Sequence, residues 1–170
     1  GVGDRGGSGE CVEGCGTESG RAAITTTLIA VAGRLCSVSV YYEDLSVGDT
    51  QSFGRYEVTR EEILSFAEQY DPQWFHTEPE RAAEQSPYGG VIASGWHTAA
   101  VTMRMLVDAV LSDAASVGAK GVDELRWPAP VRPGDVLTCE NEIVAKEPEH
   151  PERGLVHAKT ETFDQDGERV

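Results

Sequence analysis

The sequence is short of positive charge. Its 170 residues contain 14 Lys and Arg against 29 Asp and Glu, which gives a formal net charge of -15 at pH 7. Only three of the basic residues are lysines: Lys120, Lys146 and Lys159. An acidic surface repels phosphate backbones and anionic lipid head groups, so we expect neither nucleic acid nor a membrane as a partner. The same composition is typical either of a halophilic surface in a cytoplasm of high salt or of an ordinary acidic enzyme.

Cysteine and long hydrophobic runs are scarce as well. The spacing of Cys11 and Cys15 matches no zinc-binding pattern well, and only Cys139 lies in the strongly patterned part of the chain. We therefore expect no metal site and a reducing, cytoplasmic location. The apolar segment at residues 22–33 is much shorter than the roughly 20 residues that cross a bilayer.

Residues 41–170 carry the pattern of one domain. Residues 1–20 are rich in glycine and have too few apolar side chains to build a core. The acidic residues before the next apolar run, and Arg34 after it, argue against a signal peptide. We expect residues 1–40 to be an N-terminal extension that is disordered or not native to the fold. The chain stops at Val170 inside a predicted strand, which looks truncated, so we expect the natural protein to continue.

Two capping patterns predict helices ahead of the central part of the domain. Thr59 and Glu62 fit a capping box that opens a helix over residues 59–70. A second box beginning at Thr77 predicts a short helix that ends at Ala83.

One long helix and several strands complete the predicted domain. Residues 96–111 are apolar on nearly every side of a helix, which predicts burial all round. The apolar residues just before it, 91–94, are predicted as a strand. Turn residues and period-two patterns predict strands over residues 50–58, 122–127, 135–146 and 154–164, a charged loop over 146–154, and a last strand from Glu168 after an Asp166-Gly167 hairpin turn. A mostly antiparallel sheet with one long helix is an α+β fold.

The stretch DPQWFH brings two titratable side chains together. Asp71 ends the first predicted helix, and Pro72 turns the chain away from it. The negative end of the helix dipole and nearby aromatic rings should raise the pKa of Asp71. The bend lets Asp71 and His76 face one cavity, where an Asp and a His sharing a water molecule form a general acid/base pair. The alternative is an ordinary helix stop followed by a structural histidine.

The start of the long helix offers a site for an oxyanion. In GGVIASGWHT a glycine turn leads to Ser94 and Gly95, where free N–H groups and the positive end of the dipole favour negative charge. Gly95 has no side chain to block a thioester carbonyl. Ser94 also has a simpler interpretation as the N-cap, and His97 as a first-turn residue that is exposed or packed against the loop.

These segments resemble the MaoC-like (R)-specific enoyl-CoA hydratases and dehydratases, which have the hotdog fold. The likeness covers about residues 41–170 and rests on DPQWFH, GGVIASGWHTAA and LRWPAPVRPGDVL. It implies an antiparallel sheet wrapped around a long central helix, a homodimer, and a CoA thioester as substrate without a metal or redox cofactor. It also implies that Asp71 and His76 hold the catalytic water and that the Gly95 N–H binds the thioester oxygen.

The activity implied by the resemblance is reversible addition of water to a trans-2-enoyl-CoA, giving (R)-3-hydroxyacyl-CoA. Two features depart from the family pattern. Pro follows Asp71 directly, with Gln73 as the amide, where the family usually has Asn-Pro between the Asp and the His. The polar residue that usually supports the Asp from inside the central helix falls near Thr102, which is the candidate substitute. A hotdog thioesterase and a non-catalytic acyl-CoA-binding domain are the alternatives.

We also expect an acyl pocket between these segments. The residues predicted to line it are Trp74, Phe75, Val91, Ile92, Ala93, Ser94 and Trp96. Packing in the core would explain the aromatic rings equally well.

Overall fold

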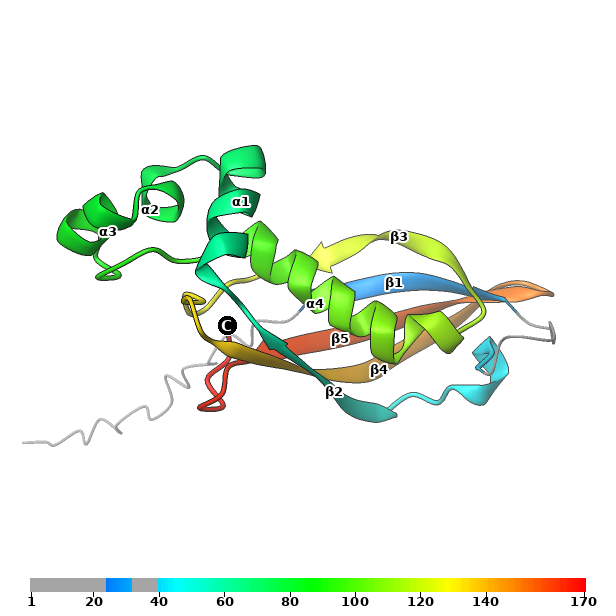
Figure 1. The fold of residues 1–170 in the computed structure, drawn as a ribbon. Coiled ribbons are helices and arrows are strands. Elements are labelled where there is room, and N and C mark those ends of the chain that lie inside the picture. Colours follow the sequence, from blue (N-terminus) through cyan, green and yellow to red (C-terminus); the bar gives the residue numbers. More distant parts are fainter. Residues whose placement is uncertain (1–23, 32–39) are drawn as a thin grey trace, which may run out of the picture.

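One antiparallel sheet organises the fold (Figure 1). The computed structural model describes residues 24–31 and 40–170. Within these ranges the strands lie in the order β2-β4-β5-β1-β3, and every pairing between neighbours is antiparallel. The strands are β1 (Ile24–Val31), β2 (Thr50–Glu57), β3 (Ser116–Glu124), β4 (Val136–His150) and β5 (Arg153–Phe163).

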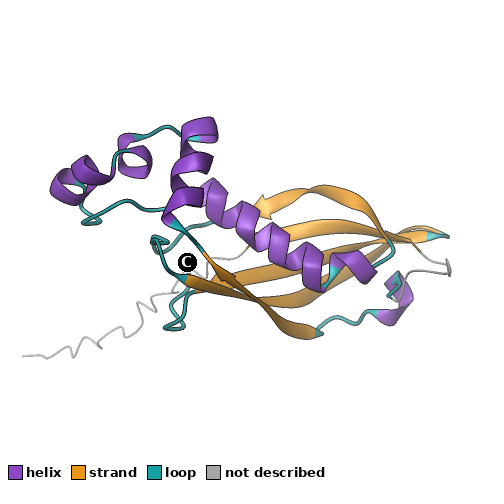
Figure 2. Ribbon diagram, in the orientation of Figure 1, coloured by secondary structure: helices purple, strands orange, loops and turns teal. Residues whose placement is uncertain are grey.

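The long helix α4 (Gly95–Ala109) lies across one face of this sheet (Figure 2). Side chains alternate along a strand, so every second residue of β4 faces the helix. Leu137 and Cys139 of β4 accordingly pack in one buried cluster with Val101 and Met105 of α4. A sheet curved around a single long helix is the hotdog arrangement, so the predicted α+β hotdog fold is confirmed.

The sheet begins earlier in the chain than its sequence pattern indicated. β1 pairs with β5 along one edge and with β3 along the other. The prediction of an extension over residues 1–40 is therefore wrong for residues 24–31, while residues 1–23 and 32–39 lie outside the described part of the chain. The run ITTTLIAV is rich in β-branched residues, which favour a strand. Its apolar content alone did not indicate this.

Helices α1, α2 and α3 gather beside the start of α4 (Figure 1). The predicted capping box opens α1: the Thr59 hydroxyl accepts from the Glu62 N–H at 3.2 Å, and the Thr59 N–H donates to the Glu62 carboxylate at 3.1 Å. The helices are α1 (Arg60–Tyr70), α2 (Trp74–Thr77) and α3 (Pro79–Gln85), and the described residues also include the one-turn 3-10 helices η1 (Tyr42–Asp44) and η2 (Leu111–Asp113).

Two local predictions between α1 and α4 are wrong. Thr77 does not cap a helix, because it ends α2 and its hydroxyl donates to the Gln73 carbonyl at 3.1 Å. Glu78 takes the N-cap of α3 without a side-chain hydrogen bond. Residues 91–94 form a loop instead of a strand. The Ala93 N–H donates to a carbonyl in the loop after β3, at 2.8 Å, but no ladder of bonds follows.

The β4–β5 hairpin is longer than predicted. Most of the charged segment 146–154 continues these two strands, and the turn itself is only Pro151 and Glu152. β3 also starts and ends earlier than its predicted range. The turn at Gly167 is present, with a φ of 78°, but Arg169 makes one isolated bridge where a strand was predicted.

The central helix is covered on one side only. Its inner face is buried against the sheet, whereas Trp96 is 60% exposed and Met103 and Val107 are each 40% exposed. The prediction of burial all round is therefore wrong within this chain, because a single sheet covers one face of a helix.

Gly54 lets β2 pass close to α4. Its φ is 81°, and it lies at an irregularity in the β2–β4 pairing between Phe53 and Tyr56. A Cβ at Gly54 would lie 2.5 Å from the Met105 sulfur and 3.2 Å from the Met105 Cβ. Glycine is therefore required twice here, by the backbone conformation and by the close approach.

We predict that Gly54→Ala lowers the free energy of unfolding by about 1 kcal/mol more than Gly48→Ala does. Gly48 is a matched control because its φ is also positive, 93°, but a Cβ there would meet no atom within 4 Å. The backbone strain is thus shared, and the difference isolates the contact with Met105. Urea unfolding of the two variants measures it, and equal losses would contradict the proposed packing.

Candidate active site

A pocket of about 460 Å³ opens at the N-terminal end of α4. Asp71, His76 and Gly95 all line it, although they come from the end of α1, from α2 and from the start of α4. The three residues that the sequence motifs singled out are therefore brought together at one cavity. The loop after β3 forms the opposite wall with Trp127 and residues 128–131.

Both carboxylate oxygens of Asp71 are held by hydrogen bonds. Asp71 is the C-cap of α1, with a φ of -148°, and Pro72 follows it directly. The Ser94 hydroxyl donates to Oδ2 at 2.6 Å, and the Gln73 side-chain amide donates to Oδ1 at 2.8 Å. The carboxylate therefore has a fixed orientation at the pocket wall.

These bonds reverse the predicted direction of the Asp71 pKa shift. The Ser94 hydroxyl has the largest effect, and it lowers the pKa of Asp71 below its ordinary value. Partial burial acts in the opposite direction, while the Gln73 amide and the charge of His76 lower the pKa further. The predicted increase is wrong because donors to the ionised form outweigh desolvation here.

His76 is buried, and both of its ring nitrogens have defined surroundings. Nδ1 lies 2.7 Å from the Ile92 carbonyl oxygen, which can only accept, so Nδ1 carries a proton. Nε2 lies 3.5 Å from Asp71 Oδ2. In the neutral ring, Nε2 is consequently a proton acceptor at the side of the carboxylate.

Gly95 lies beneath the ring of Trp127. A Cβ at this position would overlap the Trp127 indole, so only glycine allows the ring to pack against the helix start. The Gly95 N–H is one of the first-turn donors that a helix cannot satisfy by itself. With the positive end of the dipole of α4 behind it, this end of the pocket suits a developing negative charge.

Ser94 has two roles at the helix start. Its oxygen accepts from the Trp96 N–H at 3.3 Å, which confirms the predicted N-cap. The same hydroxyl donates to Asp71, a contact that the sequence interpretation missed because the residues are 23 positions apart. By contrast, Thr102 does not support Asp71: its hydroxyl bonds to Thr162 beneath the helix, at 2.7 Å.

His97 takes no part in this pocket. Its ring is buried and stacks on Phe66 of α1, with centroids 4.8 Å apart. Burial lowers the pKa of His97, and the carboxylate of Glu62 partly offsets this effect. His97 is a first-turn residue of α4 as predicted, but the prediction that it is exposed or packed against the loop is wrong, because its ring is buried against helix α1.

The predicted acyl-pocket residues divide into two groups. Phe75, Ile92, Ala93 and Trp96 line the pocket, and Ser94 touches it through Asp71. Two residues are not among those that line it: the Trp74 ring lies 4.6 Å below the Arg81 guanidinium, and Val91 is buried in the main core. The sequence interpretation missed Tyr88 and Trp127, although the proline-rich WPAPV was the signal for a wall-forming loop.

Two further sequence predictions concern metal and membrane. Cys139 is buried below α4, while Cys11, Cys15 and Cys36 fall outside the described residues. In residues 24–31 and 40–170, no three His, Cys, Asp or Glu side chains gather in a way that could hold a metal ion. No helix in these same ranges has the length and apolar character needed to cross a membrane.

Comparison with known proteins places this geometry in a family. Residues 45–164 match the model of the MaoC like domain, which is well over half of the chain. The chain belongs to the MaoC-like domain family. The solved structure of the MaoC-like dehydratase from Rhodospirillum rubrum is 43% identical, with a TM-score of 0.72 over 78% of this chain and 90% of that one.

Two other proteins similar to this MaoC-like chain are named as a regulatory protein and as a dehydratase. The monoamine oxidase regulatory protein from Archaeoglobus fulgidus is 26% identical, with a TM-score of 0.72 over 81% of this chain and 92% of its own. The 3-hydroxyacyl-thioester dehydratase Z of Mycobacterium tuberculosis is 34% identical over 92 residues, which are 53% of this chain and 60% of that protein. Dehydratases are therefore among the proteins that this chain resembles.

We predict that Ser94→Ala raises the pKa of Asp71. The wild-type carboxyl should titrate below its ordinary value, because the Ser94 hydroxyl stabilises the ionised form. Because its pKa is lowered, the wild-type Asp71 carboxyl stays ionised until the pH falls to that lower value. Without the Ser94 hydroxyl, the carboxyl of the variant should take up its proton at a higher pH. Carbon NMR titration of the Asp71 carboxyl measures both midpoints. Ser94→Thr keeps the hydroxyl and should keep the wild-type midpoint, whereas an unchanged value in Ser94→Ala would refute the assignment.

Proposed function

We propose that the protein catalyses reversible addition of water to a trans-2-enoyl-CoA, giving (R)-3-hydroxyacyl-CoA. The observation that carries this proposal is the convergence of Asp71, His76 and Gly95 on one pocket, with Asp71 Oδ2 and His76 Nε2 3.5 Å apart. Two neighbouring acceptors facing a cavity are suited to hold one water molecule.

The chemistry follows from the places of these groups. The oxygen of the held water bonds to C3 as the Asp71–His76 pair takes a proton from it. The π electrons of the double bond move onto C2 and the thioester oxygen, where the Gly95 N–H and the dipole of α4 stabilise the charge. The pair then returns a proton to C2, and the reverse sequence gives dehydration. The lowered pKa of Asp71 favours the ionised carboxylate, which accepts a hydrogen bond from the water and orients it toward the substrate.

Two observations support the proposed substrate class. One similar protein is the 3-hydroxyacyl-thioester dehydratase Z of Mycobacterium tuberculosis, whose name describes the same type of compound. The pocket walls also include apolar and aromatic side chains, among them Phe75, Ile92 and Trp127, which suit contact with an acyl chain. The proposed reaction transfers no electrons, and Asp71, His76 and the Gly95 N–H supply the base and the oxyanion donor, so the proposal includes no metal or redox cofactor.

We predict that Asp71→Asn and His76→Ala each lower kcat/KM for hydration of crotonyl-CoA by at least about a hundredfold. Asn cannot accept the proton from water, and Ala removes the second acceptor. Glu68→Gln is the matched control, since it removes an exposed carboxylate from the same helix as the Asp71 cap. Loss of enoyl absorbance measures the rate.

A thiol assay on the same samples separates hydration from hydrolysis. Free CoA thiol without loss of the double bond would make the protein a thioesterase. Binding of the acyl-CoA without either product would make it an acyl-CoA-binding domain. Near-normal hydration by both site variants would also overturn the proposed roles.

We further propose that the protein acts as a homodimer. β3 is an edge strand whose Val117 and Val122 are 63% and 51% exposed, and the outer face of α4 exposes Trp96 and Met103. An edge strand with exposed apolar side chains is suited to pair with the same strand of a second copy. Sedimentation velocity should give about twice the mass of one chain, and Val122→Glu should shift it toward the monomer. A monomer at micromolar wild-type protein would contradict this part of the proposal.

A further inference from the structure

A second, apolar cavity lies at the other end of α4. It has a volume of about 310 Å³, and no residue that lines it also lines the catalytic pocket. Its walls come from the last turns of α4 and from the sheet beneath, including Leu28, Leu106, Ile143 and Val156. The cavity is wide enough for several methylene groups but is not part of the site described above.

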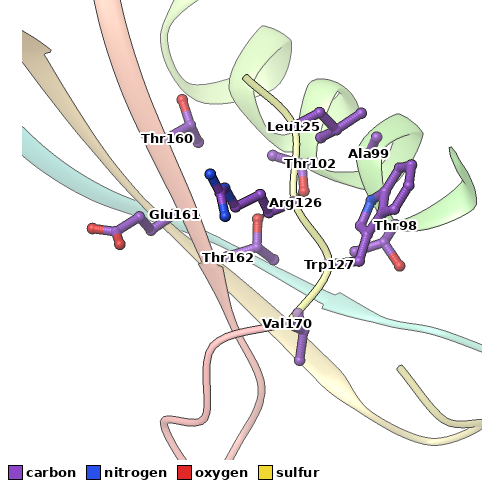
Figure 3. A pocket seen from close by; sticks show the side chains of 10 residues that line it. All are labelled: Thr98, Ala99, Thr102, Leu125, Arg126, Trp127, Thr160, Glu161, Thr162 and Val170. Atoms are coloured by element: carbon purple, nitrogen blue, oxygen red, sulfur yellow. Dashed lines mark hydrogen bonds between the residues drawn. The ribbon is translucent and has the colours of Figure 1, made fainter. Parts of the chain in front are cut away.

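Four polar side chains lie between this cavity and the catalytic pocket. The hydroxyls of Thr102 on α4 and Thr162 on β5 are 2.7 Å apart, and the Thr160 hydroxyl donates to the Asn141 side-chain oxygen at 2.9 Å. All four residues are at least nine-tenths buried. Figure 3 shows Thr102 reaching down from the helix toward Thr162 on the strand. We call these four residues the threonine barrier.

The space on the catalytic side of the barrier is nearly closed. A crevice of about 10 Å³ shares Thr98 and Trp127 with the catalytic pocket and ends at Thr102, Thr160 and Thr162 (Figure 3). A volume of this size holds about one water molecule. On the far side, Asn141 is the barrier residue that lines the apolar cavity.

An acyl chain cannot cross the barrier without breaking its hydrogen bonds. A methylene group placed between Thr102 and Thr162 would leave buried hydroxyls without partners, and that loss outweighs the gain from burying one apolar group. The pairing between the hydroxyls also joins the middle of α4 to β5, beside the apolar packing of Val101 and Met105 on β4. The barrier thus closes the route both by the space it fills and by its bonds.

We infer that the threonine barrier ends the acyl pocket and limits the substrate to short acyl chains. This inference rests on the proposed function and names the substrate class within it. The apolar cavity beyond the barrier becomes usable only when Thr102 and Thr162 are cut back. Chain-length selectivity is then set by a hydrogen-bonded pair in the core and not by the walls around Asp71.

The test uses wild-type protein and two double variants. Thr102→Ala with Thr162→Ala removes both hydroxyls and both methyl groups, which opens the route and leaves no orphaned partner in that pair. Thr102→Val with Thr162→Val fills the same space without the hydroxyls and is the matched control. Neither residue lines the catalytic pocket, so hydration of crotonyl-CoA serves as the internal standard.

For wild type, kcat/KM should fall at least about tenfold from crotonyl-CoA to octenoyl-CoA, the scale expected when the added methylenes cannot be buried beyond the barrier. The alanine variant should raise the ratio of octenoyl-CoA to crotonyl-CoA turnover by about tenfold or more. The valine variant should keep the wild-type ratio. Equal turnover of both substrates by wild type, or an unchanged ratio in a folded alanine variant, would overturn the inference.

Calorimetric titration with butanoyl-CoA and octanoyl-CoA separates this inference from the proposed function, because binding needs no turnover. Wild type should bind butanoyl-CoA at least about tenfold more tightly. Tighter binding of butanoyl-CoA without any hydration would contradict the proposed reaction and support the inference about the barrier. Equal affinities for the two ligands would contradict the inference about the barrier, even if the alanine variant fails to fold and hydration is confirmed.

Discussion

The hydrogen bond from Ser94 to Asp71 is the contact on which the site depends. It joins the N-cap of α4 to the C-cap of α1, two positions that the chain itself separates by a loop and two short helices. One buried hydroxyl thereby caps the central helix, fixes the carboxylate and lowers its pKa. His76 reaches the same carboxylate from α2, held by its bond to the loop that leads into Ser94. The base, its partner and the helix start are therefore positioned as one unit.

Helix α4 gives the molecule a polar end and an apolar end along one axis. Its N-terminus faces the pocket with Asp71 and His76, its middle is bonded to the sheet through Thr102, and its last turns cover the apolar cavity. The strand pattern repeats this division, since β5 presents Thr162 and Thr160 under the first half of the helix and Ala158 and Val156 under the second. Placement of a reacting thioester at the start of the helix would direct its acyl chain toward the polar middle.

Local patterns predicted the parts of this structure that local interactions determine. The capping box at Thr59 needs only residues three positions apart, and the spacing of Asp71 and His76 is set by a single bend. The central helix followed from its continuous apolar residues. The sequence did not show that only one side of this helix is buried. Met103 and Met105 are the same residue type, but Met105 faces the sheet and is buried whereas Met103 is exposed.

The remaining features depend on contacts between distant segments. β1 is a strand because β5 and β3 flank it, and residues 91–94 are a loop because no neighbouring strand pairs with them. The pKa shift of Asp71 has the opposite direction to the predicted one because it also depends on a contact with a distant segment. The helix end and the aromatic rings are visible in the sequence, but the donor from Ser94 is supplied by the fold.

A crystal structure of the Asp71→Asn variant with bound crotonyl-CoA tests the central claim most directly. The account predicts the thioester oxygen within hydrogen-bond distance of the Gly95 N–H and C3 facing a water molecule held between residue 71 and His76. A thioester bound elsewhere on the protein, or turned so that C3 faces away from His76, would contradict it.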